Sequence, residues 1–170
     1  MTFETNGVLP AGFHDYTYDE FCKTFVEDFP TSQRRRMIAE ALLEFSREVF
    51  AIGVPCEFWI DGSYATAKVN PNDADIILFF QYQHMVQLQP LWQSFRQKYA
   101  GVLDIYFWYA KSPENERLLK PADYNQIINQ RNYWRGQFGF DREDRPKGII
   151  RIDCKSIEEK LMGGEDCATY

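Results

Sequence analysis

The sequence predicts an α+β fold of the α/β-sandwich kind, in which helices flank a mixed β-sheet. Two apolar segments, 56–60 and 76–80, are typical of strands, and Gly62-Ser63 begins the connection between them. A third segment, 101–109, is rich in aromatic and β-branched residues and also favours a strand. The 170 residues contain no repeats, low-complexity tracts or linkers, and they are enough to bury one core. We therefore expect a single domain over 1–170.

The first 30 residues are expected to form a lead-in to the core. Pro10 and Gly12 indicate extended, partly loose chain at its beginning. A short helix is expected over 18–26, with Asp15 or Thr17 as its N-cap.

The clearest helix of the chain begins after Thr31 or Ser32, either of which can cap it. Its apolar residues recur at helical spacing, and Gly53 and Pro55 end it. Arg34, Arg35 and Arg36 occupy its first turn, where successive side chains diverge by about 100° and cannot grip one ligand together. Two interpretations stay open: a solvated or ion-paired helix start, or one arginine that reaches a phosphate.

The segment 81–99 reads as a polar connector that contains a helix, and its length fits parallel or mixed pairing of the strands on either side. Residues 111–116 read as a surface loop, followed by a long helix from Pro121 to about Gly136. That helix mixes aromatic and basic residues, which is typical of a core-facing stripe but also of a surface that stacks on nucleic acid. A final strand over 148–154 and a short helix close the chain.

Three acidic residues are the candidate site. Asp73 and Asp75 are two positions apart, so on a strand both side chains would point to the same face. Two adjacent carboxylates repel each other, and a hard cation such as Mg²⁺ relieves that repulsion. Asp104 is embedded in the apolar third strand, where an unpaired acid is costly, so it is expected to join the same site.

Gly62 and Ser63 are the candidate phosphate ligands. A glycine lets a ligand approach the backbone closely, and free N–H groups at the start of the short helix expected over 64–69 would attract anions. Lys68 on that helix could offset nucleotide charge. Asp61 could join a metal site, although capping of the turn is the simpler account.

In order and spacing this pattern resembles the nucleotidyltransferase superfamily of the DNA polymerase β type, in its minimal form. The resemblance rests on Gly62-Ser63, nine intervening residues, Asp73-x-Asp75 before apolar residues, and Asp104 on a later strand. It implies a nucleotidyltransferase fold with a core at about 31–110 and an extension over 111–170. It further implies that Gly62 and Ser63 hold the β- and γ-phosphates of a nucleoside triphosphate. The acids Asp73, Asp75 and Asp104 would hold two Mg²⁺ ions, with Mn²⁺ as a substitute.

The implied activity is transfer of a nucleoside monophosphate from the triphosphate, which is the substrate, to a hydroxyl of RNA, of a protein or of a small molecule. Residues 9–14, 59–63 and 146–149 also resemble a small, largely uncharacterised bacterial family of such proteins. Small bacterial members of the superfamily are linked to toxin–antitoxin pairs and phage defence. An antitoxin or another partner protein is therefore implied as well.

Two other functions stay open. A catalytically silent binding module, such as an antitoxin or a regulatory partner, could retain the fold. A metal-dependent nuclease is the third alternative, because Asp153-Cys154-Lys155 after an apolar strand is an Asp-x-Lys motif. The nuclease interpretation leaves Gly62-Ser63 and the paired acids unexplained.

Composition excludes several classes. The net charge of -6 argues against a nonspecific nucleic-acid coat, which requires Lys and Arg to neutralise phosphates. The four cysteines form no Cys-x-x-Cys pair and have no neighbouring histidine, so zinc is not expected. The first residues lack the basic and apolar regions of a signal peptide, and no apolar run approaches the roughly 20 residues of a membrane helix. A soluble, cytoplasmic protein with no membrane partner is expected.

Overall fold

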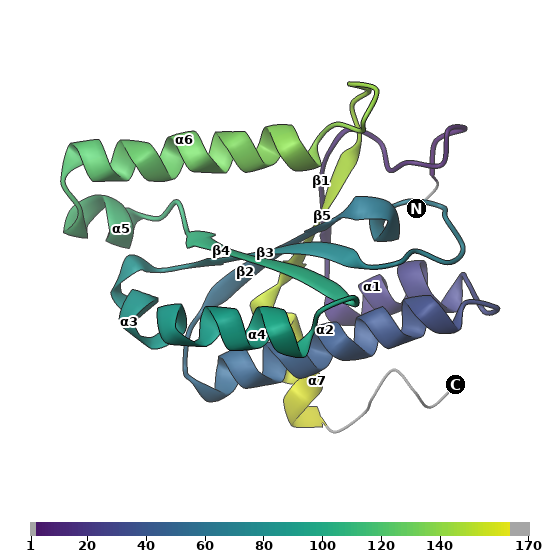
Figure 1. Cartoon of the computed structure of the whole chain (residues 1–170), viewed down its shortest axis with the longest axis horizontal. Coiled ribbons are helices and arrows are strands. Elements are labelled where there is room, and N and C mark those ends of the chain that lie inside the picture. Colours follow the sequence, from purple (N-terminus) through teal and green to yellow (C-terminus); the bar gives the residue numbers. More distant parts are fainter. Residues whose placement is uncertain (1–2, 164–170) are drawn as a thin grey trace.

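The computed structural model describes residues 3–163 and shows a mixed five-stranded sheet flanked by helices (Figure 1). The strands are β1 (Gly12–Tyr16), β2 (Cys56–Asp61), β3 (Ala74–Phe80), β4 (Leu103–Tyr109) and β5 (Gly148–Asp153). Their order is β1-β5-β2-β3-β4. The pairs β1–β5 and β3–β4 are parallel, whereas β2 is antiparallel to both of its neighbours. The α+β class and the mixed sheet are thus confirmed.

Helices of very different length connect the strands. The α-helices are α1 (Tyr18–Cys22), α2 (Gln33–Ala51), α3 (Met85–Leu88), α4 (Trp92–Lys98), α5 (Pro113–Leu118), α6 (Pro121–Phe138) and α7 (Cys154–Gly163). A π-helical turn, Lys23–Glu27, continues α1, and 3-10 turns occupy Gly62–Ala65, Tyr82–His84 and Gln89–Leu91. No helix within residues 3–163 is long and apolar enough to cross a membrane.

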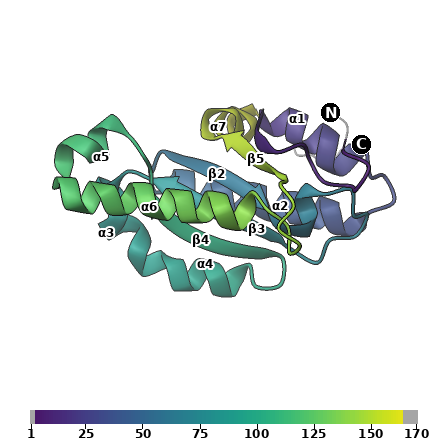
Figure 2. The same ribbon diagram turned by 90° about the horizontal axis from the view of Figure 1, so that it is seen from above.

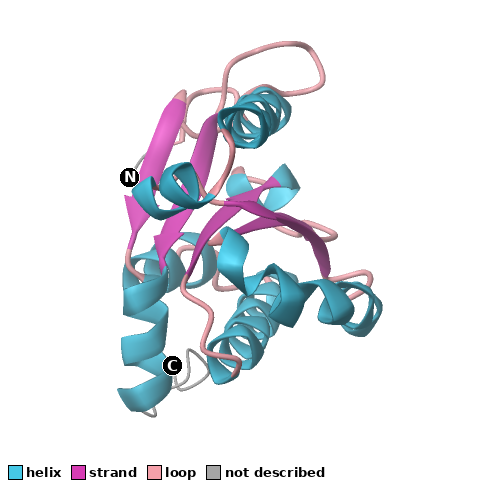
Figure 3. Ribbon diagram, turned by 90° about the vertical axis from the view of Figure 1, so that its left-hand side faces the viewer, coloured by secondary structure: helices cyan, strands magenta, loops and turns pink. Residues whose placement is uncertain are grey.

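The two faces of the sheet are covered differently. On one face, α1, α2, α4 and α7 enclose the larger apolar core (Figures 1 and 3). On the other face, α6 is the one helix within residues 3–163 that lies across the strands (Figure 2), over a small cluster of Trp59, Ile77, Phe79, Phe138 and Ile149. Side chains alternate along a strand, so every second residue of each strand belongs to the face under α6.

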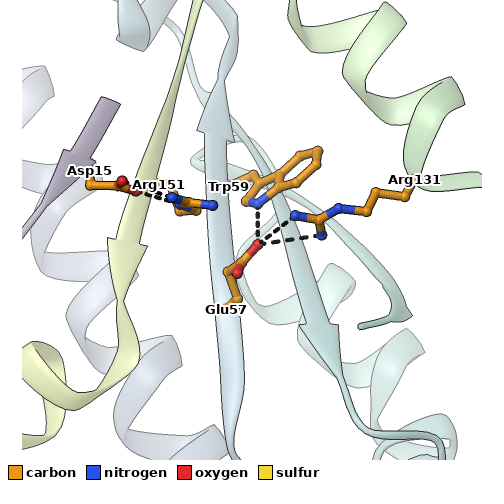
Figure 4. A network of polar contacts seen from close by, with 5 residues as sticks. All are labelled: Asp15, Glu57, Trp59, Arg131 and Arg151. Atoms are coloured by element: carbon orange, nitrogen blue, oxygen red, sulfur yellow. Dashed lines mark hydrogen bonds and ion pairs between the residues drawn. The ribbon is translucent and has the colours of Figure 1, made fainter. Parts of the chain in front are cut away.

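The contact of α6 with the sheet is partly polar. The Arg131 guanidinium lies 4.4 Å from the ring centroid of Trp59 and donates to Glu57 at 3.4 Å (Figure 4). The indole Nε1 of Trp59 donates to the same Glu57 oxygen at 2.5 Å. A single carboxylate therefore anchors both the helix and the indole of the strand beneath it.

Capping explains why the first two helices begin where they do. Thr17 and Glu20 form a capping box at α1, and the Ser32 hydroxyl accepts from the N–H of Arg35 at the start of α2. Asp15 or Thr17 was expected to cap the first helix, and Thr17 does. Thr31 or Ser32 was expected to cap the second, and Ser32 does.

Three expected elements were wrong. The lead-in contains β1, which is an edge strand hydrogen-bonded to β5. The loop expected over 111–116 contains α5, because Ser112 accepts from the N–H of Asn115 and Pro113 fits the first helical turn. The helix expected over 64–69 is absent. The chain instead makes one 3-10 turn at Gly62–Ala65, and Arg35 then binds the carbonyl groups of the residues that follow.

Candidate active site

Three acids lie side by side on the adjacent strands β2, β3 and β4. Asp61 is the register partner of Asp75 on β3, and Asp75 is the register partner of Asp104 on β4. Register partners point to the same face, and neighbouring strands are about 4.8 Å apart. Asp61, Asp75 and Asp104 therefore form one row, on the α6 face and at one end of the three strands.

Asp75, the middle acid of the row, has no direct partner for its carboxylate, although the charges of Lys147 and Arg142 act on it from a distance. Within residues 3–163, no hydrogen bond to its carboxylate and no ion pair is found. Burial raises the pKa of Asp75, and the charges of Asp73 and Asp104 raise it further. Ionised Asp75 is therefore unfavourable as the chain stands, and a bound cation would relieve this.

Asp73 lies just outside the strand, which corrects the expectation that both acids sit on it. β3 begins at Ala74, whose N–H donates to the carbonyl of Val102 at 3.1 Å. Asp73 is half-buried and, among the described residues, also has no ion-pair partner. Asp73 lies in the loop directly before β3, and its charge contributes to the raised pKa of Asp75.

Gly62 is required where the strand turns away from this row. Its φ is +77°, in the left-handed region that favours glycine. A Cβ at this position would lie 2.2 Å from Oδ2 of Asp75. Any side chain at Gly62 would thus displace the Asp75 carboxylate, so the glycine and the acid form one unit.

The turn at Ser63 is too short to act as a helix terminus. It spans Gly62–Ala65, and Thr66 closes it by donating to the Ser63 carbonyl at 2.8 Å. Among residues 3–163 the Ser63 hydroxyl has no hydrogen-bond partner. An anion here would bind to that hydroxyl and to backbone N–H groups rather than to a helix dipole. Lys68 follows the turn, and its side chain is exposed.

Asp61 forms a buried ion pair, which neither of the two sequence-based roles anticipated. Lys147 Nζ donates to both carboxylate oxygens, at 2.8 and 2.6 Å. Burial raises the pKa of Asp61 to about 7, although Lys147 and the N–H of Gly62 favour the ionised form. Lys147 also favours ionisation of Asp75, as does Arg142.

Asp104 is held by two side chains that the sequence analysis did not identify. The Tyr106 hydroxyl donates to Oδ2 at 2.6 Å, and Arg96 Nη2 lies 3.8 Å from Oδ1. The bond to Asp104 raises the pKa of Tyr106 to about 12, so its hydroxyl remains a donor at neutral pH. Tyr106 follows Asp104 by two residues on a strand, a spacing that indicates a shared face.

Two arginines at the start of α2 hold the loops of the site. Arg34 donates to the carbonyls of Asn72 and Gly101, the residues before Asp73 and shortly before Asp104. Arg35 is fully buried and donates to the carbonyls of Phe25, Tyr64, Thr66 and Lys68. Both expectations for these two arginines, a solvated or ion-paired helix start and a phosphate ligand, are therefore replaced by binding to main-chain carbonyls. The two arginines fix main chain on both sides of the acids.

The residues fit a divalent metal by the chemistry of their donors. In this arrangement no group of three or more His, Cys, Asp or Glu side chains among residues 3–163 is placed to hold a metal ion. Carboxylate oxygens are nevertheless the ligands that Mg²⁺ prefers. Asp73 and Asp75 supply them without competing ion pairs, whereas Asp104 is shared with Tyr106.

The Asp-x-Lys motif lies apart from this row. Lys155 is on α7, at the opposite end of β5 from Lys147, and its side chain is exposed and 3.9 Å from Glu159. The side chain of Asp153 lies outside what the structure describes.

Comparison with known proteins identifies a family but no activity. No curated protein and no solved structure matches the chain. A family of unknown function, DUF6932, matches residues 1–153. This match covers the whole sheet and every residue of the candidate site, and the chain therefore belongs to the DUF6932 family.

Proposed function

We propose that this protein is a Mg²⁺-dependent nucleotidyltransferase that moves a nucleoside monophosphate from a nucleoside triphosphate to a hydroxyl acceptor. The observation that carries the proposal is the Asp75 carboxylate, which has no hydrogen bond or ion pair within residues 3–163, is repelled by Asp73 and Asp104, and lies against Gly62. Such an arrangement opposes folding, because like charges are brought together without a partner. A metal-bound triphosphate explains why the chain tolerates it.

Each residue of the site has a part in binding the triphosphate. Asp73, Asp75 and Asp104 would hold Mg²⁺, which supplies positive charge to the phosphates. The Ser63 hydroxyl and the backbone around Gly62 would bind the terminal phosphates, and exposed Lys68 would offset remaining charge. Arg34 and Arg35 keep these loops in place through main-chain carbonyls, so the geometry exists before substrate arrives.

The reaction needs little from the protein beyond position and charge. An acceptor hydroxyl oxygen forms a bond to the α-phosphorus, and the bond from that phosphorus to the β-phosphate oxygen breaks. Pyrophosphate leaves with the electron pair of the broken bond. The hydroxyl proton passes to solvent through the Asp104 carboxylate, whose side chain is 40% exposed.

The direct test is nucleotide transfer in a cell lysate. Each α-labelled triphosphate is incubated with Mg²⁺, lysate and either wild type or the Asp73→Ala, Asp75→Ala double variant. We expect labelled product with the wild type and a loss of at least about a thousandfold in the variant, because metal-assisted charge stabilisation supplies several kcal/mol. A Glu114→Ala, Glu116→Ala variant removes two exposed carboxylates of α5 and serves as the charge-matched control.

Thermal stability separates this function from the alternatives. A triphosphate with Mg²⁺ at about 100 times its dissociation constant should add about 2.7 kcal/mol to the free energy of unfolding. The double variant should show no such gain, while its own stability stays equal or rises because repulsion is removed. A response to metal alone would favour a nuclease. No response to metal or nucleotide, together with no labelled product, would contradict the proposal and favour a silent binding module.

A further inference from the structure

A cavity of about 460 Å³ opens beside the acidic row, between the end of α6, the start of β1 and the loop before β5. Phe13 and Phe140 supply aromatic surface to it, and Asn132, Arg135 and Lys147 supply polar groups. Its volume is in the range of small-molecule sites. No carboxylate is among the residues that line it, in a protein whose net charge is -6.

The cavity and the acids belong to one line across the sheet. Phe13 is the register partner of Ile149, which also lines the cavity. Ile60 is paired with Ile150, so one residue further along Asp61 is next to Ile149. Phe13 is thus about 14 Å, or three strand spacings, from Asp75. Lys147 connects the two regions, because it lines the cavity and binds Asp61.

Arg135 gives the cavity its charge. Arg131 and Arg151, its neighbours on this face, are paired with Glu57 and Asp15. Arg135 has no ion-pair partner among residues 3–163, and its guanidinium lies 5.9 Å from the ring centroid of Phe13. An exposed guanidinium beside an aromatic ring is suited to a ligand that has both a flat ring and an anion.

Gly136 keeps the cavity open at a cost in stability. A glycine inside a helix destabilises it by roughly 1 kcal/mol relative to alanine. Gly136 lies in α6 and lines the cavity, and a Cβ there would meet no atom within 4 Å. The helix backbone does not require a glycine here, since a Cβ would meet no neighbouring atom. A larger side chain at this position would occupy the space of the cavity.

We propose that this cavity binds the acceptor of the transfer reaction, and that it holds a planar ring bearing an anionic group, as in a nucleoside monophosphate. The ring lies against Phe13 and Phe140, and the anion binds Arg135. That the bound ligand is the acceptor rests on the proposed function. The bound unit is either a free nucleotide or the terminal nucleotide of an RNA, which present the same chemistry.

Calorimetric titration with adenosine 5′-monophosphate in the absence of divalent metal tests the site. We expect wild type to bind it, and Arg135→Ala to bind it about tenfold or more weakly, because a charged hydrogen bond is lost. Neutral adenosine should bind both proteins equally. Gly136→Leu should block both ligands by filling the cavity. The controls are Arg117→Ala on exposed α5 and Gln137→Leu, which is exposed and does not line the cavity.

The test separates the cavity from the acids. The Asp73→Ala, Asp75→Ala variant should bind the monophosphate as wild type does, whereas Arg135→Ala should keep the stabilisation by Mg²⁺ and triphosphate. If the proposed transfer fails but these titrations succeed, the cavity remains a nucleotide site. No binding to wild type, or equal binding to wild type, Arg135→Ala and Gly136→Leu, overturns the inference.

A trinucleotide RNA identifies the source of the bound unit. Tighter binding of the trinucleotide than of the monophosphate, again lost in Gly136→Leu, supports the site and assigns it to an RNA end. Weaker binding of the trinucleotide supports the site and assigns it to a free nucleotide.

Discussion

The surroundings of Arg35 and of Arg131 show two ways of holding a buried guanidinium. Arg35, on the face covered by α1, α2, α4 and α7, is 0% exposed and among the described residues donates only to backbone carbonyls, with Phe29 and Tyr64 stacked nearby. The Arg131 side chain, under the single helix α6, is 18% exposed and is paired with a carboxylate. Burial lowers the pKa of both arginines, to about 10 at Arg35.

These surroundings indicate which side of the candidate site is fixed. No carboxylate is hydrogen-bonded or ion-paired to Arg35 within the described chain, so its charge is stabilised mainly by carbonyl dipoles, most of them from the loop after Gly62-Ser63. If that loop moved, the buried Arg35 guanidinium would lose its carbonyl acceptors, and a buried charge without partners is costly. Arg131 can exchange Glu57 for water, because both lie near solvent. The side of the candidate site formed by the Gly62-Ser63 turn is therefore rigid, and the side covered by α6 is adjustable.

The largest effect is expected from Arg35→Ala. It leaves several inward-facing carbonyls without donors and creates a cavity, so we expect a loss of about 3–5 kcal/mol in the free energy of unfolding. Urea denaturation followed by circular dichroism measures it. Arg35→Lys keeps the charge with fewer donors, and it should lose less and remain folded enough to measure. A loss below about 1 kcal/mol, comparable to exposed Arg117→Ala, would show that the loop is not fixed by this residue.

A smaller effect is expected from Arg131→Ala. Stacking on Trp59 and Phe79 and the pair with Glu57 together should contribute about 1–2 kcal/mol. A double-mutant cycle with Glu57→Gln isolates the charge pair, and its coupling energy should be below about 1 kcal/mol. If Arg131→Ala lowers the free energy of unfolding as much as Arg35→Ala does, the two faces do not differ in rigidity as inferred.

The strands and the acids were predictable because they depend on local pattern. Apolar runs predicted β2, β3, β4 and β5, and Gly62 and Asp75 were both singled out, although their direct contact is seen only in the structure. β1 was missed because an edge strand needs only one partner and carries few β-branched residues. Arg35 was misread because its position in the first turn of α2 suggested solvent, and only the fold shows that a loop over 64–68 closes above it.

Pairs of residues far apart in the sequence could not be predicted, because only the fold brings them together. Lys147 is 86 positions from Asp61, and no periodicity relates them. Tyr106, two residues after Asp104, could have been found from strand alternation alone. The cavity also depends on tertiary contact, because Phe13 and Arg135 come from opposite ends of the chain.

The smallest effect is expected at Arg151, which extends the comparison to a third, more exposed arginine. Its side chain is 33% exposed, and it donates to Asp15 at the sheet edge (Figure 4). The hydrogen bond from Arg151 holds the pKa of Asp15 below its usual value of 3.8. The stability from this pair is therefore present above that value and is lost as the pH falls through the lower pKa of the folded state. Asp15→Asn should cost less than about 1 kcal/mol at pH 7 and less near pH 2 than at pH 7, because the wild-type carboxylate takes up a proton as the pH falls. Urea denaturation at both pH values measures the difference. An equal cost at the two pH values would mean that Asp15 acts through neutral hydrogen bonds. The loss of stability would then not follow the exposure of Arg35, Arg131 and Arg151.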